Sequence, residues 1–542
     1  MLKRPAARAM CRVALNREIR ASPTIETGNF SGVGHELLAM AGPSPPSLIE
    51  EAAVATTAAV EWRITVEGTD AFGEVRRHEI RVDKDWDRLF DGEIGLSVED
   101  GKKIIAALQT AVVSQEADTY TLFRRICPDC GALRPVKDYT TRRIRTVFGT
   151  AEVRNPRWML CRNCHPGLAF AFAPLCEICP DRATPELREL TARLGSMMPY
   201  RQAASVLAEF LPLEPTETHA TVRKRTIRTG ERLDRQAAEE ERSAASQVKD
   251  RRQLELEFPG DRRREFVISV DTAHVRGADP KSARNFELVV ARCGRGGRGE
   301  TGGRYFVTAS TDQDALRDRA LHALGQEGYR GFGDVAVISD GAEILKRLPR
   351  VMPRPTTHII DWFHIAMKIQ PMQQIADHMA RSQRDEPEAS PSIARRIRAV
   401  KWRLWHGRVD WAIRDLQELL DRLKPADEIE DLPASRIRSL GAQLLTYVAS
   451  NRSAIINYGK RYRAGLRVAS TLAESAVNSI VGKRLAKSQQ MRWSVRGAHM
   501  LMQVRTADVN GELRDRLRAE FRKADPPVPS AFRPKPPLLR AA

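Results

Sequence analysis

The sequence predicts a multidomain α+β protein whose largest part is a mixed α/β domain interrupted by helices. Two apolar segments, 267–270 and 335–339, have the composition of buried strands, and an aspartate follows each of them. Farther along the chain, the segment 395–423 is expected to form helices. At 542 residues the chain is long enough for roughly three or four domains, and 42% apolar residues can fill their cores.

The first 120 residues are expected to contribute one small folded piece. Residues 1–55 mix Pro, Ser, Ala and Gly with no sustained period, which predicts a disordered leader. Residues 56–120 form an α+β piece, with strands at 62–67 and 78–82 and a helix capped by Ser97. The start lacks the apolar run of a secretory signal, and no run of 18 apolar residues occurs. We therefore expect a cytoplasmic protein without a membrane segment.

Six of the eight cysteines occur in Cys-x-x-Cys pairs, which predicts a zinc ribbon at 121–180. The two strongest pairs are Cys127 with Cys130 and Cys161 with Cys164. A strand, a turn and a strand between them would bring the pairs together, and four thiolates form the closed tetrahedral site of structural Zn²⁺. The remaining pair, Cys176 and Cys179, lacks a partner pair. It consists either of buried free thiols or of an alternative second knuckle.

A helix-turn-helix-like DNA-binding segment is predicted at 181–235. Thr184 and Pro185 open a helix, and two further helical patterns follow, the second of them polar and basic. The basic residues expected to contact DNA are Arg223, Lys224 and Arg225. The pattern also fits two ordinary surface helices with a basic face. Residues 236–262 are expected to form a charged helical linker.

Residues 263–375 and 465–510 are predicted to form the two parts of an RNase-H-like core, separated by an all-α insertion at 376–464. After the strand that carries Asp271, two strands form a hairpin, and a crossover helix follows. Next come the strand that carries Asp340 and a fifth strand that runs into a helix. This order of elements is typical of a mixed sheet.

Three acids in these two parts, Asp271, Asp340 and Glu474, have the chemistry of a metal site. Carboxylates suit Mg²⁺ or Mn²⁺, and two such ions about 3.5–4 Å apart can bind the attacking and the leaving oxygen of a phosphodiester. The 134 residues from Asp340 to Glu474 exceed what one sheet crossover needs, which favours an inserted domain. Two plainer interpretations remain open: Asp340 can cap a helix, and Thr471 with Glu474 fits a capping box. If Glu474 is not the third ligand, Glu343 is the substitute.

The charge of the chain favours a polyanionic partner. Lys and Arg number 88 against 69 Asp and Glu, a formal net charge of +19. Such a protein should attract nucleic acid and lose affinity as salt rises. Residues 511–542 continue this trend as a basic, Pro-rich tail.

Several stretches resemble one family of enzymes. They are 269–271, 339–343, 361–364, 473–475 and 491–498, together with the cysteine pairs and the segment 184–204. In these stretches the chain resembles the DDE transposases of bacterial insertion sequences, specifically the group around the ISKra and ISL types. The resemblance covers about 120 to 515. It departs from the family pattern at 471–473, where Thr-Leu-Ala replaces a glycine-rich lead-in.

The resemblance implies roles for individual residues. Asp271, Asp340 and Glu474 would be the catalytic triad that holds two Mg²⁺ or Mn²⁺ ions. Asp361 and His364 match an Asp-x-x-His signature, so His364 would orient Asp361 or touch the scissile phosphate; a packed histidine is the alternative. Arg492 and Trp493 would contact DNA.

The expected function is therefore that of a transposase. It would bind transposon ends and target DNA, both double-stranded, as a homo-oligomer, and catalyse metal-dependent strand cleavage and strand transfer. Two alternatives remain: a DNA-binding regulator derived from a transposase with an inactive core, and a plain RNase-H-like nuclease. Trp402, Trp405 and Trp411 could stack on an unpaired base, although tryptophans at helical spacing more often belong to a core.

Overall fold

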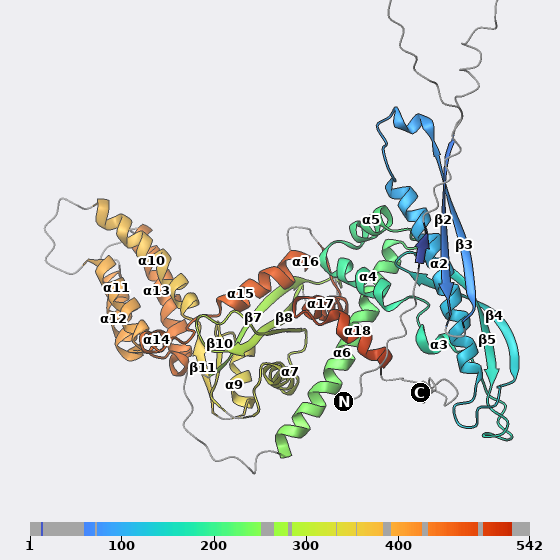
Figure 1. The fold of residues 1–542 in the computed structure, drawn as a ribbon. Helices are drawn as coiled ribbons and strands as arrows, with labels where there is room; N and C mark the ends of the chain where they lie inside the picture. The colour runs from blue at the N-terminus through green and yellow to red at the C-terminus, as the bar shows by residue number, and fades with distance from the viewer. Residues whose placement is uncertain are drawn as a thin grey trace, which may run out of the picture. The chain divides into compact units, whose positions relative to one another are not determined.

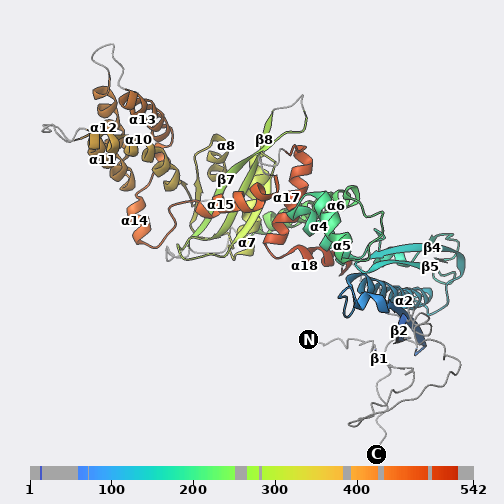
Figure 2. The ribbon, with the colours of Figure 1, turned by 90° about the horizontal axis from the view of Figure 1, so that it is seen from above.

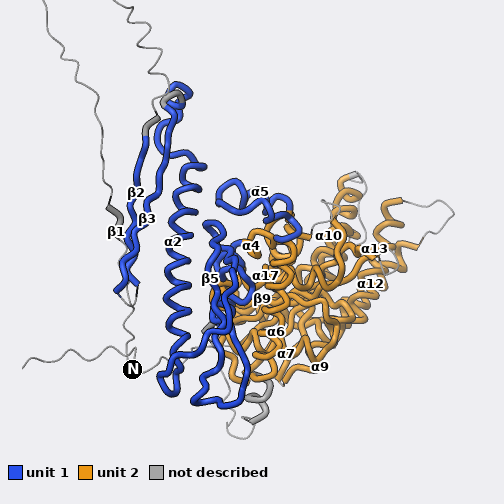
Figure 3. Tube along the Cα trace, turned by 90° about the vertical axis from the view of Figure 1, so that its right-hand side faces the viewer, with its two compact units in different colours: residues 1–190, 201–221, 517–542 blue, residues 191–200, 222–516 orange. Residues whose placement is uncertain are grey.

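The computed structural model describes residues 12–14, 59–70, 73–250, 265–279, 284–331, 333–353, 355–382, 392–424, 432–485 and 491–522. The chain divides into two compact units (Figure 3). Unit 1 comprises residues 1–190, 201–221 and 517–542, and unit 2 comprises residues 191–200 and 222–516. Apart from 12–14, the leader expected at 1–55 lies outside the described residues, as do 251–262 of the expected linker and 523–542 of the expected tail.

Unit 1 begins with a three-stranded antiparallel sheet that packs against a long helix. The sheet is formed by β1 (Arg12–Ala14), β2 (Ala59–Thr69) and β3 (Val75–Asp85), followed by the short helix η1 (Trp86–Leu89) and by α2 (Val98–Arg125). Helix α2 begins at a capping box, in which the Ser97 hydroxyl accepts from the N–H of Asp100 and the Asp100 carboxylate accepts from the N–H of Ser97. The strands and the capped helix predicted at 56–120 are therefore present.

A second antiparallel sheet in unit 1 carries the cysteine pairs. It contains β4 (Val136–Thr146), β5 (Gly149–Met159) and β6 (Ala171–Phe172), and the short helix α3 (Leu175–Ile178) follows. Gly149 closes the tight turn between β4 and β5 with a φ of 109°, a conformation that favours glycine. Helix α2 lies between the two sheets (Figure 3), and its Val113 and Ala117 pack with Ile144 and Val153 of the second sheet. The helix thus supplies the core of a ribbon that is too thin to bury its own side chains.

Three helices follow, and the third is much longer than the sequence suggests. They are α4 (Pro185–Met197), α5 (Tyr200–Phe210) and α6 (His219–Asp250). Helix α6 runs without a break from the basic residues at 223–225 through the first half of the expected linker. Leu233 is buried in it. Residues 236–250 of the expected linker are therefore part of a continuous helix, and the buried Leu233 lies just before them.

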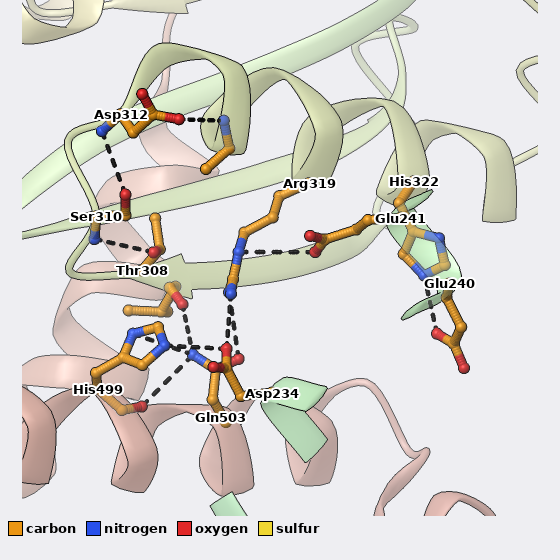
Figure 4. Close-up of polar contacts among 12 residues, drawn as sticks. Asp234, Glu240, Glu241, Thr308, Ser310, Asp312, Arg319, His322, His499 and Gln503 are labelled. Atoms are coloured by element: carbon orange, nitrogen blue, oxygen red, sulfur yellow. Dashed lines mark hydrogen bonds and ion pairs between the residues drawn. The ribbon is translucent and has the colours of Figure 1, made fainter. Parts of the chain in front are cut away.

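Polar contacts attach α6 to the rest of unit 2 (Figure 4). Asp234 accepts hydrogen bonds from Arg319 at 2.6 Å and from His499 at 3.0 Å. Arg319 also lies 3.6 Å from Glu241, about two turns along α6 from Asp234. Burial alone would raise the pKa of Asp234, but the hydrogen bonds from His499 and Arg319 lower it to about 2. The network thus fixes the charged carboxylate.

The centre of unit 2 is a mixed five-stranded sheet. Its strands are β7 (Phe266–Arg276), β8 (Asn285–Arg295), β9 (Arg304–Thr308), β10 (Val335–Ser339) and β11 (Thr356–Ile360), in the order β11-β10-β7-β8-β9. The pairs β7-β8 and β8-β9 are antiparallel, whereas β10 lies parallel to both β7 and β11. The hairpin and the two later strands predicted from the sequence are present in that order.

Helices cover both faces of this sheet (Figures 1 and 2). One face packs against α7 (Gln313–Gln326), α8 (Glu343–Lys346) and α9 (Leu348–Val351). The other packs against α15 (Thr471–Ala476), the π-helical turn η5 (Val477–Gly482), α16 (Lys483–Leu485) and α17 (Val495–Val509). Helix α18 (Leu513–Arg522) follows α17. Both faces of the sheet are covered, and residues 266–270 of β7 and 288–291 of β8 are accordingly buried and mostly apolar.

A helical bundle is inserted between β11 and α15. It contains α10 (Trp362–Ser382), α11 (Ile393–Trp405), α12 (Val409–Arg422) and α13 (Leu432–Ser450), followed by η4 (Arg452–Ala454) and α14 (Tyr458–Arg463). Trp405 packs against Trp362 and Tyr458 in the bundle core, whereas Trp402 and Trp411 are 60% and 55% exposed. The core interpretation thus holds for one of the three tryptophans considered for base stacking. None of the described helices has the length and apolar character needed to cross a membrane.

Candidate active site and metal centres

Three aspartates lie at one edge of the central sheet, at the C-terminal ends of its parallel strands. Asp340 and Asp361 directly follow β10 and β11, and Asp271 lies within β7. In the sheet register Ile338 pairs with Ser269, and Ser339 pairs with Ile360. Continuing both registers by one or two residues places the three aspartates at the same level. Parallel strands thus bring together acids that are far apart in sequence.

Helix α15 brings a glutamate to the same edge. Side chains alternate along β7, so Asp271 lies on the face of Val267 and Ala273, which is the face that α15 covers. Glu474 of α15 is close enough to Asp271 and Asp361 that their charges raise its pKa. The geometry therefore explains how residues on either side of the helical bundle can share one site.

Asp361 is the most firmly held of these acids. Its side chain is completely buried. One carboxylate oxygen accepts from the N–H of Phe363 at 2.7 Å, and the other accepts from both the N–H and the hydroxyl of Ser470. The imidazole Nδ1 of His364 lies 3.2 Å from that second oxygen. Asp361 thus joins the start of α10 to Ser470, the residue that precedes α15.

The group at this sheet edge that could hold a metal ion is Asp361, His364 and Glu474. One ligand atom from each lies within 4.8 Å of the others, and the His364 Nδ1 to Glu474 Oε1 distance is 3.6 Å. In the described part of the chain, the predicted triad of Asp271, Asp340 and Glu474 does not form a three-residue group within that distance. The group of Asp361, His364 and Glu474 and the predicted triad share Glu474. The charge of Asp361 also raises the pKa of both Asp271 and Glu474.

The two plainer interpretations of the acids can be compared with the local geometry. Asp340 accepts from the N–H of Ala342 at 2.9 Å, but helix α8 begins after Ala342 and has no side-chain cap. Helix α15 begins after Ser470, again without a side-chain cap, so Thr471 and Glu474 do not form a capping box. Glu343 is 70% exposed and lies 3.5 Å from Lys346. Its side chain therefore takes part in a surface ion pair.

Burial and crowded negative charge shift the protonation of the cluster. Burial raises the pKa of Asp271, and the charges of Asp340 and Asp361 raise it further, against a hydrogen bond from the N–H of Thr272 and the charge of His364. Burial likewise raises the pKa of Glu474. The hydrogen bond to Asp361 raises the pKa of His364. Perturbed pKa values gathered in this way are typical of functional sites.

The four predicted cysteine ligands converge in the second sheet of unit 1. Cys127 Sγ lies 3.8 Å from Cys164 Sγ, and Cys130 Sγ lies 3.4 Å from Cys161 Sγ, with all four sulfurs within 4.8 Å of one another. Zinc–sulfur bonds of about 2.3 Å in a tetrahedron place sulfurs about 3.8 Å apart. The backbone N–H of Cys164 lowers the pKa of Cys161 to about 7, whereas the Cys130 thiol and burial raise the pKa of Cys164 to about 12, so Cys161 is the sulfur most readily present as a thiolate. The four residues fit a structural Zn²⁺.

The third cysteine pair lies elsewhere in that unit. Cys176 Sγ accepts from a guanidinium N–H of Arg142 at 3.1 Å, and Cys179 is buried in the core beneath α2. Burial raises the pKa of the Cys179 thiol. Neither residue belongs to the four-sulfur group, so within the described residues the pair behaves as free thiols.

The residues predicted to contact DNA differ in exposure. Arg223 and Lys224 are exposed on α6, whereas Arg225 is half-buried beside the buried Val222 and Thr226. Arg492 is exposed, and Trp493 is half-buried. A comparison with models of known protein families found no match, and neither did a comparison with curated proteins.

Two residues of unit 2, one beside the acid cluster and one apart from it, have structural roles that the sequence does not indicate. Ser470 looks like a helix cap, yet it holds Asp361, which only the fold reveals. Arg484 reads as one more surface cation, yet its side chain is among the largest that are fully buried. The spacing of neither residue points to its partner.

Proposed function

We propose that the chain is a DDE-type transposase, which cuts DNA at transposon ends and joins the freed 3′-hydroxyl to target DNA. The single observation that carries the proposal is the meeting of Asp271, Asp340 and Asp361 at one sheet edge with Glu474 approaching from α15. A sheet built from an antiparallel hairpin followed by parallel strands supports an RNase-H-like core. The helical bundle between Asp340 and Glu474 supports the expected insertion.

The donors fit hard divalent cations. Asp271, Asp340 and Glu474 offer only carboxylate oxygens, the ligands that Mg²⁺ and Mn²⁺ prefer. Two such ions, when bound by these three residues, would activate a water or 3′-hydroxyl and stabilise the leaving oxygen. The raised pKa values of Asp271 and Glu474 mean that these carboxyls keep their protons to a higher pH than free carboxyls do. Cation binding should therefore lower the pH at which they ionise.

The remaining residues of the cluster position this set. Asp361 is buried and fully hydrogen-bonded, so it acts as an anchor for its neighbours. It holds the imidazole of His364, which in turn lies next to Glu474. Through Ser470 it also fixes the start of the helix that carries Glu474. We assign Asp361 and His364 to positioning, with His364 near enough to the acids to contact a scissile phosphate.

A strand-cleavage assay tests the proposal. The purified protein should nick DNA that carries the sequences flanking its gene in Mg²⁺ or Mn²⁺, and should join the 3′-hydroxyl ends to a second duplex. The control is the same DNA with its terminal base pairs scrambled. Cleavage of both DNAs at equal rates, without joining, would indicate a plain nuclease. Binding without any cleavage in either metal would indicate a regulator.

A further inference from the structure

Unit 2 contains a cavity about 400 Å³ in volume whose wall carries basic and aromatic side chains. It lies away from the acid cluster, beside the N-terminal end of α17. Its lining includes Arg223, Arg484 and Arg492 together with Tyr200 and Trp493, and none of the lining residues is acidic. The composition of the wall suggests an anionic ligand.

Arg484 is the unusual member of this wall, because its charge is buried and has no acid beside it. The side chain is 2% exposed. Its guanidinium lies 4.9 Å from the ring centroids of both Tyr200 and Trp493, and Nε donates to the carbonyl of Gly195 at 3.1 Å. Burial lowers the pKa of this group. Within the described residues, no carboxylate forms an ion pair with it, although a buried charge normally needs one.

Two further donors in the cavity wall are also left without a partner. The hydroxyl of Tyr200 and the indole Nε1 of Trp493 are buried and make no hydrogen bond to any described residue. A buried donor without an acceptor costs about 1–3 kcal/mol, so native structures seldom retain one without a reason. Arg484, Tyr200 and Trp493 all line the cavity, so a ligand with acceptor oxygens there would lie beside them, and it would satisfy the two donors once the Tyr200 and Trp493 side chains turn toward it.

A helix N-terminus completes the cavity wall. Ser494 caps the fifteen-residue helix α17, and Ser494 and Gly497 line the cavity. The first N–H groups and the dipole of such a helix favour an anion. The exposed Arg223 and Arg492 add two charges at the same cavity. Phosphate is the anion whose tetrahedral oxygens match so many donors.

We infer that this cavity binds a phosphate group of the DNA backbone; the identification of the source as DNA rests on the proposed function. Trp493 is tied to the end of β7, since its N–H donates to the carbonyl of Arg276 at 2.9 Å. Asp271 lies five residues earlier on the same strand. At about 3.4 Å per residue the separation is roughly 17 Å, well within one DNA turn of about 34–36 Å. One duplex can therefore reach both places.

The unpartnered donors allow a test that spares the fold. Tyr200→Phe and Trp493→Phe keep an aromatic ring beside Arg484 but remove the hydroxyl and the indole N–H. If the contacts are purely structural, both variants should bind DNA like wild type. The inference predicts DNA binding weakened about three- to tenfold in both variants. The Tm should be unchanged or raised in Tyr200→Phe and lowered in Trp493→Phe, which also loses ring volume. Fluorescence anisotropy on a 30-bp duplex without added divalent metal measures the binding.

Arg484→Met tests the charge itself, with Arg317→Met as the matched control. Arg317 is a cation on α7 that is already paired with Asp314 and Asp318. Arg484→Met should weaken binding about tenfold and lower the slope of log affinity against log salt by about 0.9, the loss of one phosphate contact. Arg317→Met should change neither. Equal slopes for the two variants, or wild-type binding by both Phe variants, would overturn the inference.

A second arm separates DNA from free phosphate. Inorganic pyrophosphate should compete with DNA only weakly. If pyrophosphate instead raises the Tm of the wild-type protein and the protein does not bind DNA, the cavity binds a small phosphate ligand, which would contradict the DNA source. These results are independent of strand cleavage. If the wild-type protein cleaves DNA and the three cavity variants bind DNA normally, the cavity inference is wrong and the transposase proposal stands. If the cavity variants bind DNA weakly and the wild-type protein cleaves nothing, the transposase proposal is wrong and the cavity inference stands.

Discussion

Asp340 and Asp361 lie at the same level at the ends of neighbouring parallel strands, because Ser339 of β10 pairs with Ile360 of β11. They nevertheless have different surroundings. Asp361 is completely buried and is held by Phe363 and Ser470, whereas Asp340 makes one local contact to the N–H of Ala342. One acid thus supports the structure, and the other remains available for a ligand.

The surroundings of Asp361 and of Asp271 predict opposite effects of two conservative substitutions on stability. Asp361→Asn leaves buried donors of Ser470 and Phe363 without a charged acceptor and should lower the unfolding free energy by about 1–3 kcal/mol. Asp271→Asn should leave the Tm unchanged or raise it, because a carboxyl whose pKa is raised by burial and by Asp340 destabilises the fold when it is ionised at neutral pH. Thermal unfolding at pH 7 without divalent metal measures both. A larger loss for Asp271→Asn would contradict the assignment.

The His364 imidazole should make stability depend on pH. Its hydrogen bond to Asp361 raises its folded-state pKa above the usual 6.5, so the stabilisation is fully present below about pH 6.5 and is lost as pH rises through the folded-state pKa. The Tm difference between wild type and His364→Gln should therefore shrink from roughly pH 5.5 to pH 8.5. Scanning calorimetry at several pH values measures it. A constant difference would show that the charge of His364 does not contribute.

Zinc content should distinguish the two kinds of cysteine. Cys127→Ser removes one of four converging sulfurs and should release zinc and loosen the ribbon, because metal binding is a large part of the folding free energy of so small a module. Cys176→Ser, outside the four-sulfur group, is the control and should keep about one zinc per chain. Metal analysis of both purified variants decides. Full zinc in Cys127→Ser, or loss from Cys176→Ser, would mean that the third pair supplies ligands.

The packing of the long helix α6 against the rest of unit 2 should be stabilised by the ionised carboxylate of Asp234. Its pKa of about 2 means that the ionised carboxylate stabilises the fold above pH 3.8, and that this contribution is lost as pH falls through 2. Asp234→Asn should lower the unfolding free energy of unit 2 by about 2 kcal/mol at pH 7. Glu240→Gln on the same helix is the control, since Glu240 is 45% exposed and its pairs should contribute about 0–1 kcal/mol. Urea unfolding should show the two effects; equal losses would contradict the network's role.

The strands that carry Asp271 and Asp340 could be predicted because an apolar run ended by an acid is a local signal. The length of α6 could not be predicted, because its many charged residues resemble those of a solvated spacer. Only the fold shows that Asp234 and Glu241 pair with Arg319. Glu474 could be predicted as a candidate third acid from its residue type and from the resemblance, but only the packing of α15 brings it near Asp271. The roles of Ser470 and Arg484 depend on partners more than a hundred residues away. Long-range contacts of this kind leave no periodicity in the sequence.

The most direct test of the central claim is strand cleavage by Asp271→Asn. The proposal predicts that the variant folds and binds DNA as well as wild type or slightly better, since one negative charge facing the phosphates is gone. It also predicts that the variant cuts transposon-end DNA in Mg²⁺ at least about a thousandfold more slowly than wild type. Single-turnover cleavage on a denaturing gel, with anisotropy on the same DNA, gives both numbers. Cleavage by Asp271→Asn at close to the wild-type rate would contradict a carboxylate-bound metal site at this sheet edge.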